Sequence, residues 1–185
     1  MKTIGEIKPS FEEFQEEMEE KIKHESLYVK KILFYAEQRK LPIEEKIVLY
    51  QGRSGDCLDE TTKNMWKQWP IKDGYQHIWS VENPDSLEDI PENIILVKIG
   101  TKEWFHYLAT AKYLVTYEMF SISFVKRKEQ VLICTAEQKE SKDELTQRLE
   151  FQMDYWYQDG SSVEGLLKQQ SIKKDIVSQG KKKLL

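Results

Sequence analysis

A glycine-containing loop after the first apolar run is the first candidate for a binding site. The residues QGRSGD, at 51–56, directly follow the strand-like run KIVLY at 46–50. Two glycines let a ligand approach the backbone closely, and Arg53 and Ser54 carry donors that can hold a phosphate. The loop matches neither the dinucleotide pattern GxGxxG nor the phosphate-loop pattern GxxxxGK[ST]. An ordinary strand-to-helix turn therefore stays open as the alternative, and only the position of the loop in the fold favours ligand contact.

The three histidines are the side chains most suited to acid–base chemistry near neutral pH. His24 lies in a charged helical stretch, His77 in a strand-like run and His106 beside aromatic residues on a predicted helix. None has the neighbouring carboxylate or serine pattern of a catalytic triad, and their spacing is not that of metal ligands. We therefore interpret all three as structural or surface residues and expect neither a metal nor a cofactor.

A group of aromatic residues offers a possible platform for a sugar or a base. Its members are Trp104, Phe105, Tyr107 and Tyr113. Most of them recur at helical spacing, which favours burial between a helix and the sheet over an exposed binding platform.

Two short basic runs are the only concentrated positive charge in the chain. One is Lys126, Arg127 and Lys128, and the other is the KKK at 181–183. A solvated run of charge is the default interpretation. Contact with an anionic lipid surface or a polyphosphate is the more specific hypothesis, since each surface cation adds about 1 kcal/mol near an anionic leaflet.

The residues 1–45 are predicted to form a helical N-terminal extension. Ser10 and Glu13 have the spacing of a capping box, and apolar residues follow at helical spacing. A second helical stretch is expected from about Ser26 to Lys40, closed by Leu41-Pro42 because a residue before proline avoids the helical region. The many glutamates of the first stretch argue against contact with an anionic membrane.

Strand-like and helical segments alternate through the rest of the chain. Predicted strands lie at 46–50, 75–81, 94–99, 113–117, 130–135 and 153–157. Predicted helices between and after them include one capped by Asp56, one opened by Gly100-Thr101, and segments at 143–152 and 161–170. This alternation is typical of a parallel sheet with helices on both faces. We predict a Rossmann-like, doubly wound α/β domain over 46–185.

Composition excludes several classes of protein. The chain has 185 residues, a net charge of -4 and 11% aromatic residues, so it can bury a core and does not present a generally basic surface to nucleic acid. It has no apolar run long enough to span a membrane, and its first residues do not resemble a secretory signal. Two distant cysteines make a disulfide scaffold or zinc site improbable. We expect a cytoplasmic globular protein.

Several linked segments resemble the CDP-glycerol glycerophosphotransferases, the family that includes teichoic acid primases and polymerases. KIVLYQGRSGD resembles their first strand and following loop. The stretch 75–116 resembles W-V-x-x-x-P, I-P-x-N-V, V-K-x-G-S and Y-Y-x-L-A-T-A-K-Y, and its block LATAKYLVT is the most specific match. KRKEQVLICT resembles K-K-K-x-Q-x-Y-I-Q-T, and weaker matches follow at 154–170 and 178–185.

The resemblance implies a GT-B fold of two Rossmann-like halves, of which this chain spans the N-terminal, acceptor-side half. In that family the other half binds CDP-glycerol and supplies further catalytic groups. The family segment W-H-G-T-P falls on 136–140, which places Glu137 at the position of the proposed catalytic-base histidine. A carboxylate can act as a general base, but its charge is unfavourable beside phosphates.

The resemblance also locates the expected substrate contacts. The family's asparagine-serine segment after the fourth strand is replaced here by Tyr117 and Glu118. Together with the glycine-containing loop and the end of the fifth strand, this predicts a substrate-binding set of Arg53, Ser54, Gly55, Asp56, Glu118 and Thr135.

The first functional hypothesis is a stand-alone, non-catalytic acceptor-side domain in teichoic acid or related cell-surface glycopolymer synthesis. It would pair with a catalytic transferase or form a homo-oligomer, and an apolar patch beside the carboxyl ends of the strands would support it. An anionic glycopolymer or the inner face of the cell membrane is a further expected contact, and nucleic acid is not. The alternatives are an active transferase that uses Glu137, and a small nucleotide-binding regulatory protein that shares only the fold.

Overall fold

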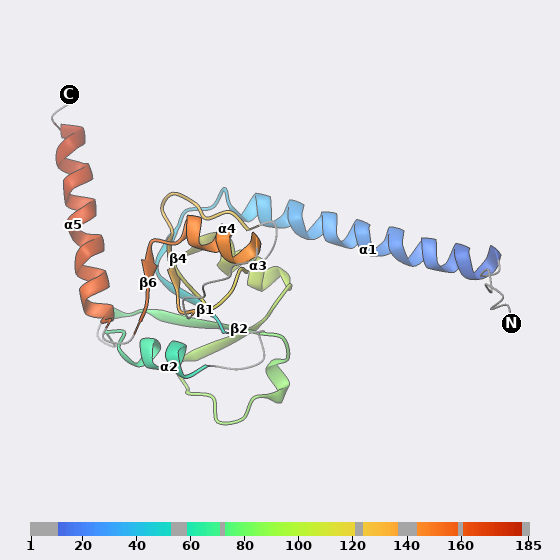
Figure 1. The fold of residues 1–185 in the computed structure, drawn as a ribbon, viewed down its shortest axis with the longest axis horizontal. Coiled ribbons are helices and arrows are strands. Elements are labelled where there is room, and N and C mark those ends of the chain that lie inside the picture. Colours follow the sequence, from blue (N-terminus) through green and yellow to red (C-terminus); the bar gives the residue numbers. More distant parts are fainter. Residues whose placement is uncertain are drawn as a thin grey trace, which may run out of the picture.

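The computed structural model describes residues 11–52, 59–70, 73–120, 124–136, 144–158 and 161–182. Its centre is a six-stranded, fully parallel sheet in the order β3-β2-β1-β4-β5-β6 (Figure 1). The strands are β1 (Glu44–Gln51), β2 (Gln76–Val81), β3 (Ile94–Lys98), β4 (Ala111–Thr116), β5 (Val131–Cys134) and β6 (Tyr155–Trp156). This is the strand order of a Rossmann-type sheet, so the predicted fold class is confirmed.

Five α-helices and one 3₁₀ turn accompany the sheet in the described residues. They are α1 (Phe11–Gln38), α2 (Glu60–Lys67), η3 (Pro84–Ser86), α3 (Lys102–Thr110), α4 (Glu144–Gln152) and α5 (Val163–Lys182). The predicted cap of α3 is confirmed, because the Thr101 side chain accepts a hydrogen bond from the Trp104 backbone. α5 continues twelve residues beyond the predicted end at residue 170.

Two local predictions were wrong. The expected two N-terminal helices are one continuous helix of 28 residues, α1. The segment between Ile22 and Ser26 contains neither glycine nor proline, so nothing in it breaks a helix. The cap of α2 is Asp59, whose carboxylate accepts bonds from the Thr62 backbone N–H at 2.9 Å and hydroxyl at 2.7 Å. The predicted cap, Asp56, lies outside the described residues.

Alternating side chains of the strands build a separate apolar core on each face of the sheet. On one face, Leu49, Leu114 and Leu132 pack with residues of α3, α4 and the end of α1. On the other face, Val48, Val115 and Ile133 pack with residues of α2 and α5. Helices therefore cover both faces, as the doubly wound prediction requires.

The end of the helical N-terminal segment contacts the α/β domain. Tyr35 is buried with its ring 5.7 Å from that of Phe105 on α3, and the amino-terminal part of α1 runs away from the domain (Figure 1). In the described part of the chain, no helix is long and apolar enough to cross a membrane.

Candidate functional site

The carboxyl edge of the sheet has the geometry that open α/β folds use for ligands. β1 lies between β2 and β4, and the strand order reverses between β1 and β4. At such a switch point the connections leave in opposite directions and open a crevice at the carboxyl ends of the strands. The residues that end these two strands are Gln51 and Thr116.

A row of polar side chains crosses four neighbouring strands at this edge. Gln51 is in register with Ser80 of β2 and with Thr116 of β4, and Thr116 is in register with Cys134 of β5. Residues in register on parallel strands point to the same face, and all four are buried. We call these four residues the polar row.

Two members of the polar row have internal hydrogen-bond partners. The Ser80 hydroxyl accepts from the Trp104 indole N–H at 3.1 Å. The Thr116 hydroxyl donates to the Glu118 carbonyl and accepts from the Glu118 N–H. Both hydroxyls are therefore satisfied by the protein itself.

Two buried oxygen atoms at the same edge lack such partners. The Oε1 atom of Gln51 and the Oγ1 atom of Thr135 are buried and have no hydrogen-bond partner among the described residues. Thr135 is held beside Thr116, because its N–H donates to the Thr116 carbonyl at 2.9 Å. Buried polar atoms are nearly always paired, so these two oxygens mark a place where a ligand or water fits.

The described part of this edge is poor in positive charge. The residues 51–52, 116–120 and 135–136 contain no lysine or arginine. Glu118, predicted to contact substrate, is exposed there and adds a negative charge. A phosphate at this edge would therefore depend on cations outside the described residues, and Arg53 is such a residue.

Cys134 does not supply a nucleophile to this edge. It is a buried free thiol, and burial raises the pKa of that thiol, which disfavours the reactive thiolate. No cluster of three or more potential metal-ligating side chains occurs within the described ranges.

The predicted site residues divide into two groups. Glu118 and Thr135 follow the carboxyl ends of β4 and β5; β4 is next to β1 in the sheet order and β5 is next to β4. The remaining predicted residues, Arg53, Ser54, Gly55, Asp56 and Glu137, lie outside the described residues. Their predicted roles stay predictions.

Sequence reasoning placed Gln51 at the start of the candidate loop 51–56 but assigned it no role, and it did not single out Ser80, Thr116 or Cys134 as site residues. Gln51 and Thr116 close apolar strands, and nothing in their local sequence distinguishes them from other strand-ending residues. The only available signal was their position, since each is the last residue of one of the two strands that flank the switch point.

The histidines lie away from the carboxyl edge. His77, near the start of β2, is 3.0 Å from the Tyr50 hydroxyl through Nδ1, and burial lowers the pKa of His77 to about 4. His106 contacts Gln38 through Nδ1 at 2.8 Å and Glu44 through Nε2 at 3.3 Å. These contacts agree with the structural interpretation of both residues.

The aromatic residues of the predicted cluster do not form one platform. Trp104 and Phe105 lie on α3 and are buried in the core between α3 and one face of the sheet. Tyr113 is buried on the opposite face, with its ring 5.0 Å from that of Trp69. They belong to the two cores.

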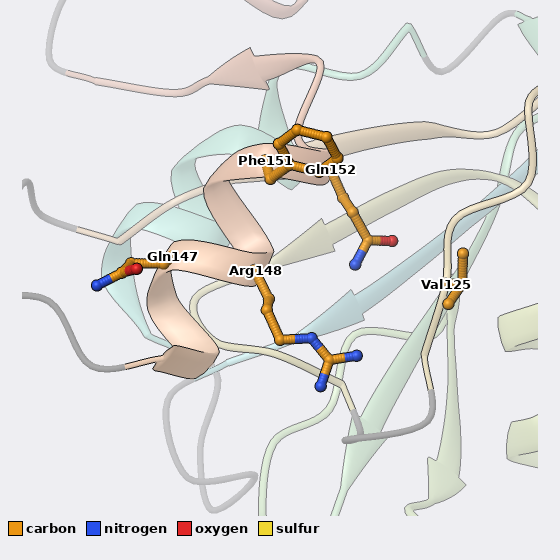
Figure 2. A pocket seen from close by; sticks show the side chains of 5 residues that line it. All are labelled: Val125, Gln147, Arg148, Phe151 and Gln152. Carbon is orange, nitrogen blue, oxygen red and sulfur yellow. The ribbon is translucent and has the colours of Figure 1, made fainter.

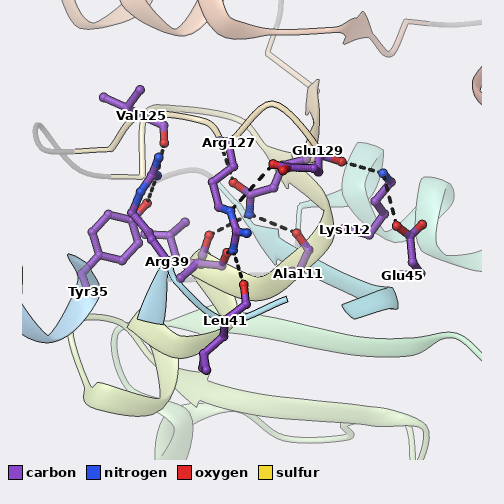
Figure 3. A network of polar contacts seen from close by, with 12 residues as sticks. Tyr35, Arg39, Leu41, Glu45, Ala111, Lys112, Val125, Arg127 and Glu129 are labelled. Carbon is purple, nitrogen blue, oxygen red and sulfur yellow. Dashed lines mark hydrogen bonds and ion pairs between the residues drawn. The ribbon is translucent and has the colours of Figure 1, made fainter. Parts of the chain in front are cut away.

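The basic run at 126–128 lies at the amino edge of the sheet, opposite the switch point. Arg127 donates to the carbonyls of Leu41 and Ala109 at 2.9 Å each (Figure 3). Lys126 forms an ion pair with Asp154 at 2.5 Å. Lys128 is the exposed member. Two of the three cations thus have internal partners, and contact of the run with an anionic surface stays a prediction.

Lys112 belongs to the same amino-edge network. It is the lysine of the block LATAKYLVT, and its side chain is buried. Its ammonium group donates to the Glu129 carbonyl at 2.5 Å and lies 3.7 Å from the Glu45 carboxylate (Figure 3). Burial lowers the pKa of Lys112, and Glu45 acts in the opposite direction. The most specific block of the sequence therefore builds structure at this edge.

An open apolar hollow of about 390 Å³ also lies at the amino edge. Gln152 and Arg148 extend from α4 on the side that faces Val125, and Phe151 is 93% exposed (Figure 2). The apolar patch expected beside the carboxyl ends of the strands is not found within the described residues. Their large exposed apolar side chains lie on α1, α5 and edge strand β3, and at the amino edge.

Comparison of the sequence with known families gives one match of direct relevance. The family described as CDP-Glycerol:Poly(glycerophosphate) glycerophosphotransferase matches residues 33–149. This chain belongs to that family. The matched stretch runs from the last turns of α1 to α4, so it includes the polar row and the amino-edge residues Lys112 and Arg127, but not Asp154.

Solved structures of the wall teichoic acid polymerase TagF share the fold of this glycerophosphotransferase-family chain. One TagF variant has a TM-score of 0.58 at 16% identity over 75% of this chain, and TagF itself has 0.54 at 18% over 75%. In both cases the match covers 40% of the TagF chain. The chain thus corresponds to less than half of that polymerase. No curated protein sequence shows detectable similarity to it.

Proposed function

We propose that this chain is an acceptor-side domain for teichoic acid or related glycopolymer synthesis, and that it binds a glycerophosphate-containing acceptor without transferring to it alone. The observation that carries the proposal is the unpartnered Oε1 of buried Gln51 at the switch point, beside β4. Membership in the glycerophosphotransferase family gives the chemical class of the ligand.

The chemistry of the edge suits a glycerol hydroxyl. The Gln51 carbonyl oxygen can only accept a hydrogen bond, whereas the Thr135 hydroxyl can donate or accept. A polyol hydroxyl can donate to Gln51, and a second hydroxyl or phosphate oxygen can accept from Thr135. The negative charge of Glu118 would repel the acceptor's phosphates from the end of β4. Arg53 is the residue that we expect to pair with these phosphates.

The lack of autonomous transfer is proposed for two reasons. The match to TagF covers 40% of that chain, so we propose that the CDP-glycerol-binding half of the family fold lies outside this α/β domain. The residue at the expected base position is Glu137, and a second carboxylate near the phosphates opposes the binding of an anionic transition state.

Binding is tested by calorimetry with a short poly(glycerophosphate) oligomer. We expect saturable binding, weakened at least tenfold by Gln51→Leu because the hydroxyl loses its acceptor. Gln76→Leu makes the same chemical change at the exposed amino end of β2 and should leave the affinity unchanged. No binding of the oligomer, or an equal loss in both variants, would contradict the proposal.

Transfer is tested separately by release of CMP from CDP-glycerol in the presence of the same oligomer. We expect none from the purified chain. Release that disappears in Glu137→Ala would show that the chain is an active transferase and that Glu137 takes the place of the histidine. In that case the acceptor site would stand and the non-catalytic role would be wrong.

A further inference from the structure

An apolar stripe runs along the side of α1 that faces away from the domain. Met18, Ile22, Val29 and Leu33 recur at spacings of four, seven and four residues, which places them on one side of a helix. Their side chains are 40% to 61% exposed. We call these four residues the α1 stripe.

The opposite side of α1 attaches the helix to its own domain. Tyr35 is buried against Phe105, and the Gln38 side chain contacts His106 at 2.8 Å. The Phe34 ring lies 5.6 Å from the Lys102 ammonium. Helical spacing puts these anchors about half a turn away from the α1 stripe. The stripe is therefore not the surface that docks α1 on α3, and the described residues of the domain leave it exposed.

Charge is distributed unequally along α1. The first part, residues 11–20, contains six glutamates and no lysine or arginine. The remainder of the helix, residues 21–38, contains four lysines and two glutamates. Two such helices side by side in parallel would place like charges together. An antiparallel pair would place the six glutamates of each helix away from those of the other and Glu20 against Lys31, which favours that orientation.

The α1 stripe is also symmetric about its own midpoint. Met18 and Leu33 lie at equal distances from the point between residues 25 and 26, and so do Ile22 and Val29. A two-fold axis at that point pairs Met18 with Leu33 of a second copy and Ile22 with its Val29, in both directions. Glu25 then faces the second copy's Ser26, and a polar contact at the centre of an apolar seam fixes its register.

We infer that α1 pairs with α1 of a second copy of this chain as an antiparallel coiled coil, which covers the α1 stripe and holds two α/β domains at opposite ends. The inference does not depend on the function proposed above, because it uses no residue of the carboxyl edge. A membrane surface fits less well, since the glutamates of the first part of α1 would be repelled by an anionic leaflet.

Orientation is tested by disulfide formation between full-length variants. In the antiparallel pair, Met18→Cys on one chain lies beside Leu33→Cys on the other, and two Met18→Cys sites lie about 22 Å apart, too far for a disulfide. An equal mixture of the two variants should form a covalent dimer on mild oxidation. Each variant alone should give only the background of the unmodified chain. A covalent dimer from Met18→Cys alone would show parallel pairing and overturn the inference.

Association itself is tested by sedimentation equilibrium over a range of concentrations. The unmodified chain should reach twice its monomer mass, and Ile22→Glu should raise the dissociation constant at least tenfold because a carboxylate enters the seam. Leu27→Glu is the matched control, since Leu27 is also about half exposed but lies off the α1 stripe. Circular dichroism should show equal helix content in both variants, as neither site is buried in the monomer.

Two outcomes of these measurements would overturn the inference. The first is a chain that stays monomeric at the highest concentration, whether or not it sediments with vesicles of phosphatidylglycerol. The second is a dimer that Ile22→Glu and Leu27→Glu weaken equally, because another surface would then form the contact.

Discussion

Gln130 and Gln51 are two buried glutamines at opposite edges of the same sheet, and their amides have different surroundings. At the amino edge, the Gln130 amide donates to the carbonyls of Leu108 and Ala111 at 3.0 Å each, and its oxygen accepts from the Arg127 N–H at 3.0 Å. At the carboxyl edge, the Gln51 oxygen has no partner among the described residues. The two glutamines are thus similarly buried, but only the side chain of Gln130 has hydrogen-bond partners for both its oxygen and its nitrogen among the described residues.

The two edges of the sheet differ in how completely their buried polar groups are hydrogen-bonded. The amino edge joins the end of α1, the start of β4 and the segment before β5 through Arg39, Lys112, Arg127 and Gln130 (Figure 3). Satisfied polar contacts of this kind stabilise a structure. At the carboxyl edge, two buried oxygens have no partner among the described residues. An unpaired buried oxygen costs stability, and a ligand that pairs with it removes this cost. Three predictions test this contrast, in order of decreasing effect.

The largest effect is expected from replacing the two glutamines by the same residue. Gln130→Leu leaves two buried carbonyls and one N–H without their partner, so the free energy of unfolding should fall by about 4 kcal/mol. Gln51→Leu removes an oxygen that is already unpaired, so the free energy of unfolding should stay the same or rise by about 1 kcal/mol. Urea unfolding of both variants measures the difference. Equal losses would mean that the two edges do not differ.

Arg127→Ala is expected to have the next largest effect. The guanidinium bridges the carbonyls of Leu41 and Ala109, which precede β1 and β4, and its loss should lower the free energy of unfolding by about 3 kcal/mol. Lys128→Ala removes the same charge from the exposed neighbour and should change it by less than about 0.5 kcal/mol. Similar losses in both variants would indicate that the charge of the run, and not the bonds of Arg127, stabilises the edge.

A smaller effect is expected from pH. Burial lowers the pKa of His77 to about 4 in the folded chain, against about 6.5 in an unfolded one. Between pH 6.5 and pH 4 the His77 side chain is protonated in the unfolded chain but not in the folded one. The free energy of unfolding is therefore highest above pH 6.5 and falls as the pH decreases toward 4. The free energy of unfolding should drop by about 2 kcal/mol from pH 7.5 to pH 5.

The control for this pH effect is a second histidine. His77→Asn should remove most of the drop, while His106→Asn, at the half-exposed contact with Gln38, should retain it. Urea unfolding at four pH values distinguishes them. A pH dependence that survives in His77→Asn would assign the titration to another group.

Much of the fold was readable from local patterns. The apolar runs IILVKI and QVLICT were predicted as strands and are β3 and β5. β5 is buried along its whole length, and a strand buried on both faces needs a continuous apolar run. Thr101 was predicted to open α3 and does so. The errors concern helix continuity and ends, as in α1 and the cap of α2, where several residues meet the same local requirement.

The candidate site was less readable than the fold. Glu118 and Thr135 were expected to bind substrate and do lie at the carboxyl edge, although no observation tests that role. Gln51 lay in the candidate loop 51–56 but was given no role, and Lys112 was given none within the most specific block. Whether a buried glutamine or lysine is satisfied depends on residues 17 to 22 positions away, such as Glu129 for Lys112 and Leu108 for Gln130.

The sequence by itself determined the family, the α/β alternation and the unequal charge of α1, because these are properties of residue types and of their spacing along the chain. The tertiary structure decided which edge each polar residue occupies and whether its atoms have partners. Strand order and register bring together groups that are distant in the chain, so hydrogen bonding and burial are set by neighbours across the sheet. The difference in hydrogen bonding between Gln51 and Gln130 is therefore a property of their places in the sheet.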